Sequence, residues 1–132
     1  MATWLTQEWL DDFTALAVDQ PERPGASTRM QYVISDAPGG ENIHYYWVLE
    51  DGKLKENRLG TLDDPELTLT ISYDDALKIQ KGELAEQAAF MQGRVKVEGN
   101  MAKLMALLPI TNSPEYRELQ AQARKLTEYP DD

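Results

Sequence analysis

The chain has 132 residues, of which 13 are Lys or Arg and 23 are Asp or Glu, and its formal net charge is −10 at pH 7. This length predicts one domain with one hydrophobic core, and the absence of cysteine excludes disulfides, thiol catalysis and thiolate metal sites. An acidic chain without a dense run of basic residues is not expected to bind nucleic acid, and anionic membranes should repel it at long range.

The first helix is expected over residues 3–18, with Thr3 as its N-cap. Its apolar stripe consists of Leu5, Trp9, Phe13 and Leu16, and a single stripe indicates a helix that packs within the fold. The start of the chain lacks the basic residues and apolar centre of a signal peptide, and no apolar run approaches the ~20 residues of a membrane-spanning helix. We therefore expect a cytoplasmic protein.

Residues 29–59 predict a meander of three strands. The second strand, over residues 43–50, has bulky side chains on both faces, which favours a position inside the sheet. Asp51-Gly52 is a strong signal for a two-residue hairpin. The third strand, over residues 53–59, is more polar, and this favours an edge position.

A fourth strand is expected over residues 67–72, where leucine and isoleucine alternate with threonine and serine. Ser72 resembles the first residue of a capping box, so a helix should begin there and end at Gly82. A short helix over residues 84–91 follows.

A fifth strand over residues 94–98 leads to a second capped helix. Charged residues alternate with two valines in this strand, which is the period of a half-buried strand. Asn100 is a good N-cap, and Pro109 is expected to close the helix. The large apolar residues of this helix are Met101, Leu104, Met105 and Leu108.

The last helix is expected over residues 113–128, with Ser113 as N-cap and Pro114 at the first helical position. Its apolar stripe consists of Tyr116, Leu119, Ala123 and Leu126. Strands that cluster between helices favour an α+β layer fold over a repeated strand–helix–strand array.

The sequence offers little for catalysis. His44 is the single histidine, so it cannot form a histidine pair for a metal, and no serine lies in a nucleophile elbow. Paired carboxylates fall at expected helix starts and in loops, where capping and the helix dipole explain them. We expect no cofactor, no metal and no enzymatic activity.

The methionines point to apolar chemistry. Met30, Met91, Met101 and Met105 are flexible side chains, of a kind that suits a surface for varied apolar shapes. On the residue pattern alone, an ordinary core and a ligand cavity both remain open.

Residues 67–108 resemble the sterol-carrier-protein family of non-specific lipid-transfer proteins. The segments that carry the resemblance are Leu67-Thr68-Leu69-Thr70-Ile71-Ser72, Phe90-Met91-Gln92-Gly93, and Gly99-Asn100-Met101 with the Lys-Leu-Met helix after it. The resemblance implies one domain over residues 1–132, with a roughly five-stranded, mainly antiparallel sheet covered by helices. It also implies an apolar tunnel between the sheet and the helices.

The resemblance further implies the residues of a lipid site. The expected wall residues are Phe90, Met91, Met101, Leu104, Met105 and Leu108, with Tyr45 and Trp47 as additions from the central strand. Gln92 is expected to hydrogen-bond a ligand head group, and the alternative is a turn residue that ties down the backbone.

The implied function is non-catalytic binding, and in some settings transfer, of a lipid or another long apolar molecule. Fatty acyl, sterol and isoprenoid-like ligands all fit this expectation. The acidity of the chain gives no support for strong binding to anionic membranes, which makes lipid binding the firmer expectation. The alternative is a protein-interaction module with a filled core, which would bind a protein partner or a second copy around Trp4, Trp9 or the last helix.

Overall fold

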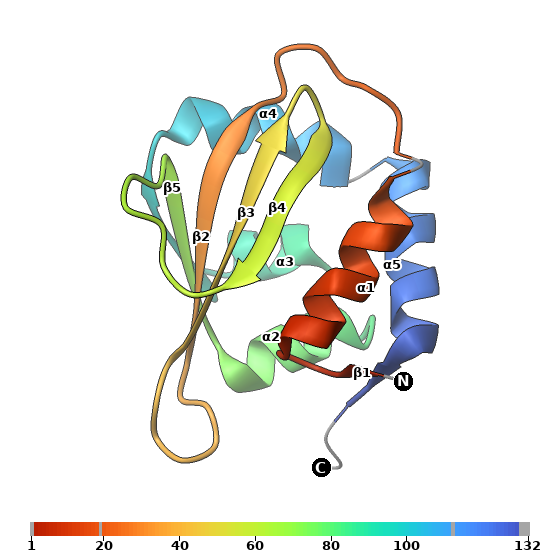
Figure 1. Ribbon diagram of the computed structural model, residues 1–132. Helices are drawn as coiled ribbons and strands as arrows, with labels where there is room; N and C mark the ends of the chain where they lie inside the picture. The colour runs from red at the N-terminus through yellow and green to blue at the C-terminus, as the bar shows by residue number, and fades with distance from the viewer. Residues whose placement is uncertain (1, 19, 112, 130–132) are drawn as a thin grey trace.

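The computed structural model describes residues 2–18, 20–111 and 113–129 and contains a five-stranded mixed sheet (Figure 1). The strands follow the order β4 (Lys53–Leu59), β3 (Ile43–Glu50), β2 (Thr28–Ser35), β5 (Leu67–Ser72) and β6 (Val95–Gly99). β2 and β5 are parallel, and the other neighbours are antiparallel. The predicted α+β class and the mainly antiparallel sheet are confirmed.

Local signals in the meander are also confirmed. Glu50 pairs with Lys53, so Asp51 and Gly52 form a two-residue hairpin, and both have positive φ (50° and 82°), as that turn requires. β4 lies at the edge of the sheet and β3 lies inside it.

Within the described residues, five helices accompany the sheet. α1 (Gln7–Ala17) and α5 (Pro114–Leu126) contact each other, and α1 also packs on β4. In Figure 1 these two helices run side by side along the right of the sheet. α2 (Tyr73–Gln80), α3 (Glu86–Met91) and α4 (Met101–Thr111) contact β5, β6 and β5, respectively. The strand register places the core residues of β2, β3 and β5 on one face, which packs against α1, α2, α4 and α5.

The predicted start of the first helix is wrong. α1 begins at Gln7, and its N-cap is Thr6, whose side chain accepts a hydrogen bond from the backbone N–H of Trp9. Thr3 belongs instead to β1 (Ala2–Thr3), which pairs in parallel with β7 (Thr127–Glu128). The sequence showed no sign of this pairing, because it joins segments that are far apart in the chain.

Three predictions about the later helices are also corrected. Pro109 lies inside α4, which continues to Thr111, because a proline in the last turn removes one donor without preventing a further two residues. Leu126 is 42% exposed, since α5 ends there and the chain continues extended into β7. The last helix was expected to run to residue 128, but α5 ends at Leu126 because the next two residues form β7.

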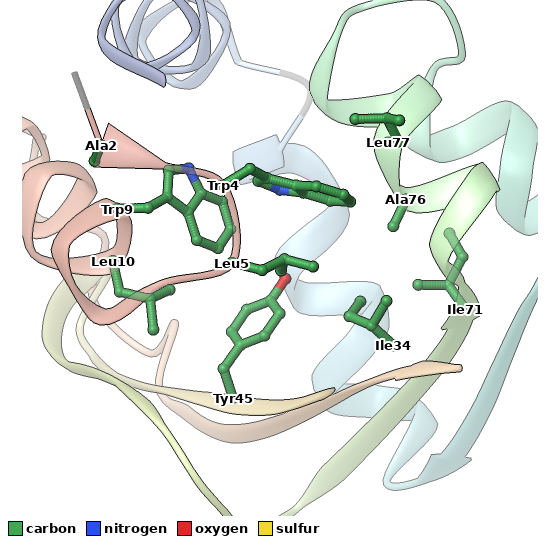
Figure 2. Close-up of a cluster of buried hydrophobic side chains, with 10 residues drawn as sticks. All are labelled: Ala2, Trp4, Leu5, Trp9, Leu10, Ile34, Tyr45, Ile71, Ala76 and Leu77. Carbon is green, nitrogen blue, oxygen red and sulfur yellow. The ribbon is translucent and has the colours of Figure 1, made fainter. Parts of the chain in front are cut away.

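One core cluster joins the N-terminal segment to the sheet and α2 (Figure 2). Trp4 and Leu5 precede α1 and are buried, and Figure 2 shows them above Tyr45 and Ile34 of the sheet. The Trp4 ring lies 6.4 Å from that of Trp9, in an edge-on arrangement. This cluster therefore anchors the segment before α1 on the sheet and on α2.

Candidate functional site

An apolar cavity of about 110 Å³ lies between the sheet and helices α2, α3 and α4. We call it the main cavity. Its lining consists of Met30, Tyr32 and Ile34 of β2, Tyr45 of β3, Leu69 and Ile71 of β5, Ala76, Ile79 and Gln80 of α2, Phe90 of α3, Val95 of β6, and Leu104, Leu107 and Leu108 of α4. The helices therefore cover the space without filling it.

Strand alternation and helix caps position this lining. On β2 and β5 every second residue faces the cavity, because side chains alternate across a strand. α2 begins where Ser72 accepts a hydrogen bond from the backbone N–H of Asp75. α4 begins where Asn100 Oδ1 accepts from the backbone N–H groups of Ala102 and Lys103. The two predicted caps are confirmed, and they fix the helices that close the cavity.

Among the described residues, the lining of the main cavity has few polar groups and no charged side chain. Its non-aliphatic members besides Phe90 are Tyr32, Tyr45 and Gln80. The rings of Tyr32 and Tyr45 are stacked, with centroids 4.7 Å apart. Since an ion without a partner is costly to bury, the lining suits an uncharged apolar group.

A second cavity of about 40 Å³ adjoins the first, and we call it the side cavity. It is lined by Phe13, Ala17, Gln20, Arg23, Met30, Trp47, Leu49, Gly52, Leu54, Leu107, Ile110, Tyr116 and Leu119. The rings of Phe13 and Trp47 stack there, with centroids 5.8 Å apart. Met30 and Leu107 line both cavities.

The side cavity contains two polar side chains with incomplete hydrogen bonding. Arg23 Nη2 donates to Ser113 Oγ at 3.1 Å and lies 3.8 Å from a carboxylate oxygen of Glu115. Arg23 Nη1 and Gln20 Oε1 are buried without a hydrogen-bond partner among the described residues. A polar ligand atom in this cavity would therefore meet both a donor and an acceptor.

The C-terminal segment is tied to α2 at the edge of the main cavity. The Tyr129 hydroxyl and Arg124 Nε both donate to the backbone oxygen of Gln80, at 3.1 and 2.7 Å. Burial raises the pKa of Tyr129, while a hydrogen bond with Thr127 and the positive charge of Arg124 act in the opposite direction. These bonds hold the end of α2, which carries Gln80 into the cavity wall.

The structure brings four of the nine expected site residues into the main cavity: Tyr45, Phe90, Leu104 and Leu108. Trp47 lines the side cavity. Met91, Met101 and Met105 lie outside both linings and are 77, 47 and 60% exposed.

Gln92 is also exposed and lies outside both linings. Its side-chain oxygen accepts a hydrogen bond of 2.7 Å from Arg94 Nε, and its backbone N–H donates to Ala88. In this arrangement Gln92 is part of the turn after α3.

Sequence reasoning missed Leu107 and most of the strand residues in the lining. Leu107 follows Leu104 at helical spacing, so the signal was present, but apart from Lys103 nearly all residues of α4 are apolar and no single apolar face stands out. The alternation that we used to predict β2 and β5 also identifies their cavity-facing residues, once the covered face of the sheet is known.

The described residues offer no evident metal site or membrane span. No group of three or more His, Asp or Glu lies together among them in a way that could hold a metal ion. Within the same part of the chain, every helix is too short or too polar to cross a bilayer.

Comparison with known proteins identifies the class. The profile of the SCP-2 sterol transfer family matches residues 14–111, and the chain belongs to this family. Membership supports lipid binding and transfer as the general function, and the family resemblance noted in the sequence is confirmed.

Individual relatives agree with this assignment. Sterol carrier protein 2 of Rattus norvegicus is 29% identical over 92 residues, which cover 67% of this chain and 16% of the rat protein. A crystal structure of sterol carrier protein 2 superposes with a TM-score of 0.72 at 14% identity, covering 92% of this chain and 98% of that one. A solution structure of palmitated SCP2L2 from Aedes aegypti gives 0.63 at 21% identity, covering 86% and 96%. At these identities the two structures show a shared fold.

Proposed function

We propose that this protein is a non-catalytic carrier that encloses the apolar chain of a lipid in the main cavity. The observation that carries the proposal is the lining of that cavity, which is apolar except for two tyrosines and one glutamine. Family membership supports the same reading. So does the palmitated relative from Aedes aegypti, whose fold this chain shares.

Burial of the chain supplies the affinity. Each methylene removed from water contributes about 0.8 kcal/mol, so the affinity rises with the number of methylenes that the cavity encloses, before the cost of ordering the ligand is subtracted. An apolar wall of this kind discriminates weakly between chains that differ by one methylene. We therefore propose broad selectivity among fatty acyl and isoprenoid-like chains.

We further propose that the preferred ligand carries an acidic head group, which Arg23 receives in the side cavity. Arg23 Nη1 is buried and has no partner among the described residues, and a buried guanidinium gains most from a charged acceptor. Glu115 lies 3.8 Å from Nη2 and is half exposed, so it neutralises the guanidinium only in part.

A pair of tryptophan substitutions tests the cavity assignment. Leu108→Trp places a large ring in the main cavity. Met105→Trp places the same ring at a position outside the lining, where the native side chain is 60% exposed. We expect Leu108→Trp to weaken hexadecanoate at least about tenfold in displacement of a fluorescent fatty acid, and Met105→Trp to stay within about twofold of wild type. Equal affinities for both variants, with the fold intact by circular dichroism, would remove the assignment.

The alternative is an interaction module with a filled core. An open cavity of 110 Å³ does not favour a filled core. If the wild-type protein binds no fatty acid, the interaction module becomes the better interpretation.

A further inference from the structure

A third cavity, of about 50 Å³, lies beside the main cavity and has a more polar wall. The polar side chains of its lining include Asn57 of β4, Gln80 of α2 and Arg124 of α5. The third cavity and the main cavity adjoin, because four residues line both: Tyr32, Tyr45, Ile79 and Gln80. Among the described residues, Arg23 lines only the side cavity, so the third cavity is separate from the proposed site of an acidic head group.

A β-bulge in β4 accompanies the inward position of Asn57. β4 has one extra residue, Lys55, opposite the step from Val48 to Leu49. A bulge changes which side chains face the inside of a sheet. Here it allows Leu54 and Asn57, three positions apart, to line the side cavity and the third cavity, respectively. Asn57 is only 5% exposed, although asparagine is uncommon both in strands and in protein interiors.

The side-chain amide of Asn57 is paired at its nitrogen and unpaired at its oxygen. Nδ2 donates to the backbone oxygen of Leu10 at 3.1 Å. Because that oxygen can only accept, the nitrogen must be the end of the amide that faces it. Oδ1 is buried and has no hydrogen-bond partner among the described residues. A buried acceptor without a partner destabilises a protein, so Asn57 is a poor choice for a wall that only has to be filled.

The groups around the third cavity favour an uncharged hydrogen-bond donor. Oδ1 of Asn57 can only accept, so its partner must carry an N–H or O–H group. Arg124 lines the same cavity and is permanently positive, which disfavours an ammonium group. A carboxylate has no hydrogen to donate to Oδ1. A hydroxyl group donates to Oδ1 without adding charge, and its oxygen is able to accept from a donor of the lining such as Gln80.

We propose that Asn57 forms a hydroxyl subsite, in which a ligand with its apolar part in the main cavity donates a hydrogen bond from its hydroxyl group to Asn57 Oδ1. This inference goes beyond the proposed function, because a neutral alcohol is a different class of ligand from the acid that Arg23 receives, and no long chain is required. A site built to pair a hydroxyl group rejects an analogue that lacks it, since the buried acceptor then stays unpaired.

The dimensions of the cavities set the size of the probe. A cavity of about 150 Å³ accommodates benzene, and the main and third cavities measure about 110 and 50 Å³. A six-membered ring with one hydroxyl group therefore matches the two adjoining spaces. Phenol is such a molecule, and fluorobenzene has nearly the same shape without the hydrogen-bond donor. A purely apolar cavity would prefer fluorobenzene, because burying a hydroxyl group without a partner is costly.

Two variants isolate the role of the Asn57 amide. Asn57→Leu replaces the amide by an apolar group of similar size, and the backbone oxygen of Leu10 still accepts from the Thr14 hydroxyl at 2.9 Å. Thr28→Val is the matched control. The Thr28 hydroxyl oxygen is also buried without a partner among the described residues, but Thr28 lines none of the three cavities.

Titrations with phenol and fluorobenzene, followed by nitrogen-15 NMR, measure the affinities of wild type and both variants. We expect wild type to bind phenol at least about fivefold more tightly than fluorobenzene, and Thr28→Val to keep this ratio within about twofold. Asn57→Leu should reverse the preference. A wild-type protein that binds phenol no more tightly than fluorobenzene, or an unchanged ratio in Asn57→Leu, would overturn the subsite and leave the third cavity as a site for water only.

A second measurement uses the unaltered protein, in case Asn57→Leu does not fold. Leu69 and Ile71 line the main cavity and neither of the other two. We expect phenol to give nuclear Overhauser contacts to their methyl groups and to shift the carbon-13 signal of the Asn57 side-chain carbonyl, which fluorobenzene should leave in place. An Asn57 signal that phenol does not move would reject the subsite.

The subsite and the proposed function fail separately. Binding of hexadecanoate by a protein that shows no preference for phenol would reject the subsite and keep the carrier function. A preference for phenol without any binding of hexadecanoate would keep the subsite and reject the carrier function.

Discussion

Gly99 is the position at which one added methyl group should lower the stability of the fold most. It ends β6 directly before the N-cap of α4, its φ is +115°, and an added Cβ would lie 2.3 Å from the backbone oxygen of Glu66. That oxygen also accepts a hydrogen bond from the backbone N–H of Asn100. Gly99→Ala therefore has to move β6 away from β5 or disturb the start of α4.

The expected magnitude has two parts. Backbone strain at positive φ costs about 1–3 kcal/mol, and a forced shift in a packed region costs about 1–3 kcal/mol more. We expect Gly99→Ala to lower the free energy of unfolding by about 2–6 kcal/mol, which corresponds to a fall in Tm of roughly 10–20 °C for a domain of this size.

Gly93→Ala is the matched control for this prediction. Gly93 also has positive φ (+75°), but an added Cβ there meets no atom within 4 Å. This variant should carry only the backbone strain, about 1–2 kcal/mol. Urea unfolding of both variants measures the difference. Equal destabilisation by Gly99→Ala and Gly93→Ala would refute the close approach of Gly99 to Glu66.

Three further predictions concern ligand charge, pH and capping. Arg23→Gln should reduce the preference for hexadecanoate over 1-hexadecanol at least about fivefold, because a charge-assisted hydrogen bond to the carboxylate is lost. Displacement of a fluorescent fatty acid by each ligand measures this preference, and an unchanged preference would argue against a role of Arg23 in binding the head group. Burial raises the pKa of both Tyr73, where Asp74 adds to the effect, and Tyr129. Above pH 10 the folded state then binds more protons than the unfolded state, so the free energy of unfolding should fall as the pH rises through the raised pKa values, and these groups should leave it unchanged below pH 10. Tyr129→Phe should flatten this decline when unfolding is measured in urea at several pH values. An unaltered dependence of the unfolding free energy on pH would contradict the prediction. Asn100→Ala should cost about 1 kcal/mol, because the cap of α4 is lost, and a change within 0.3 kcal/mol of zero would show that the cap contributes little.

The sequence predicted those structural features that depend only on residues close together in the chain. The hairpin at Asp51-Gly52 and the caps at Ser72, Asn100 and Ser113 depend on side chains that act within three or four residues. Each of them is present as predicted.

Features set by distant contacts were missed. Thr3 and Thr6 are equally good caps by residue type, and only the pairing of Thr3 with Glu128 decides between them. The same limit applies to the wall of the cavity. Periodicity could not orient α4, since both of its faces are apolar, so Met105 and Leu107 could be told apart only once the packing of the helix on the sheet was known.

The most direct test of the carrier function is to determine what the purified protein holds when no ligand has been added. Native mass spectrometry followed by lipid extraction gives both the stoichiometry and the chemical class of a bound molecule. We predict a near-stoichiometric adduct with the mass of a single-chain lipid. A protein of bare polypeptide mass that also fails to displace a fluorescent fatty acid would contradict the account.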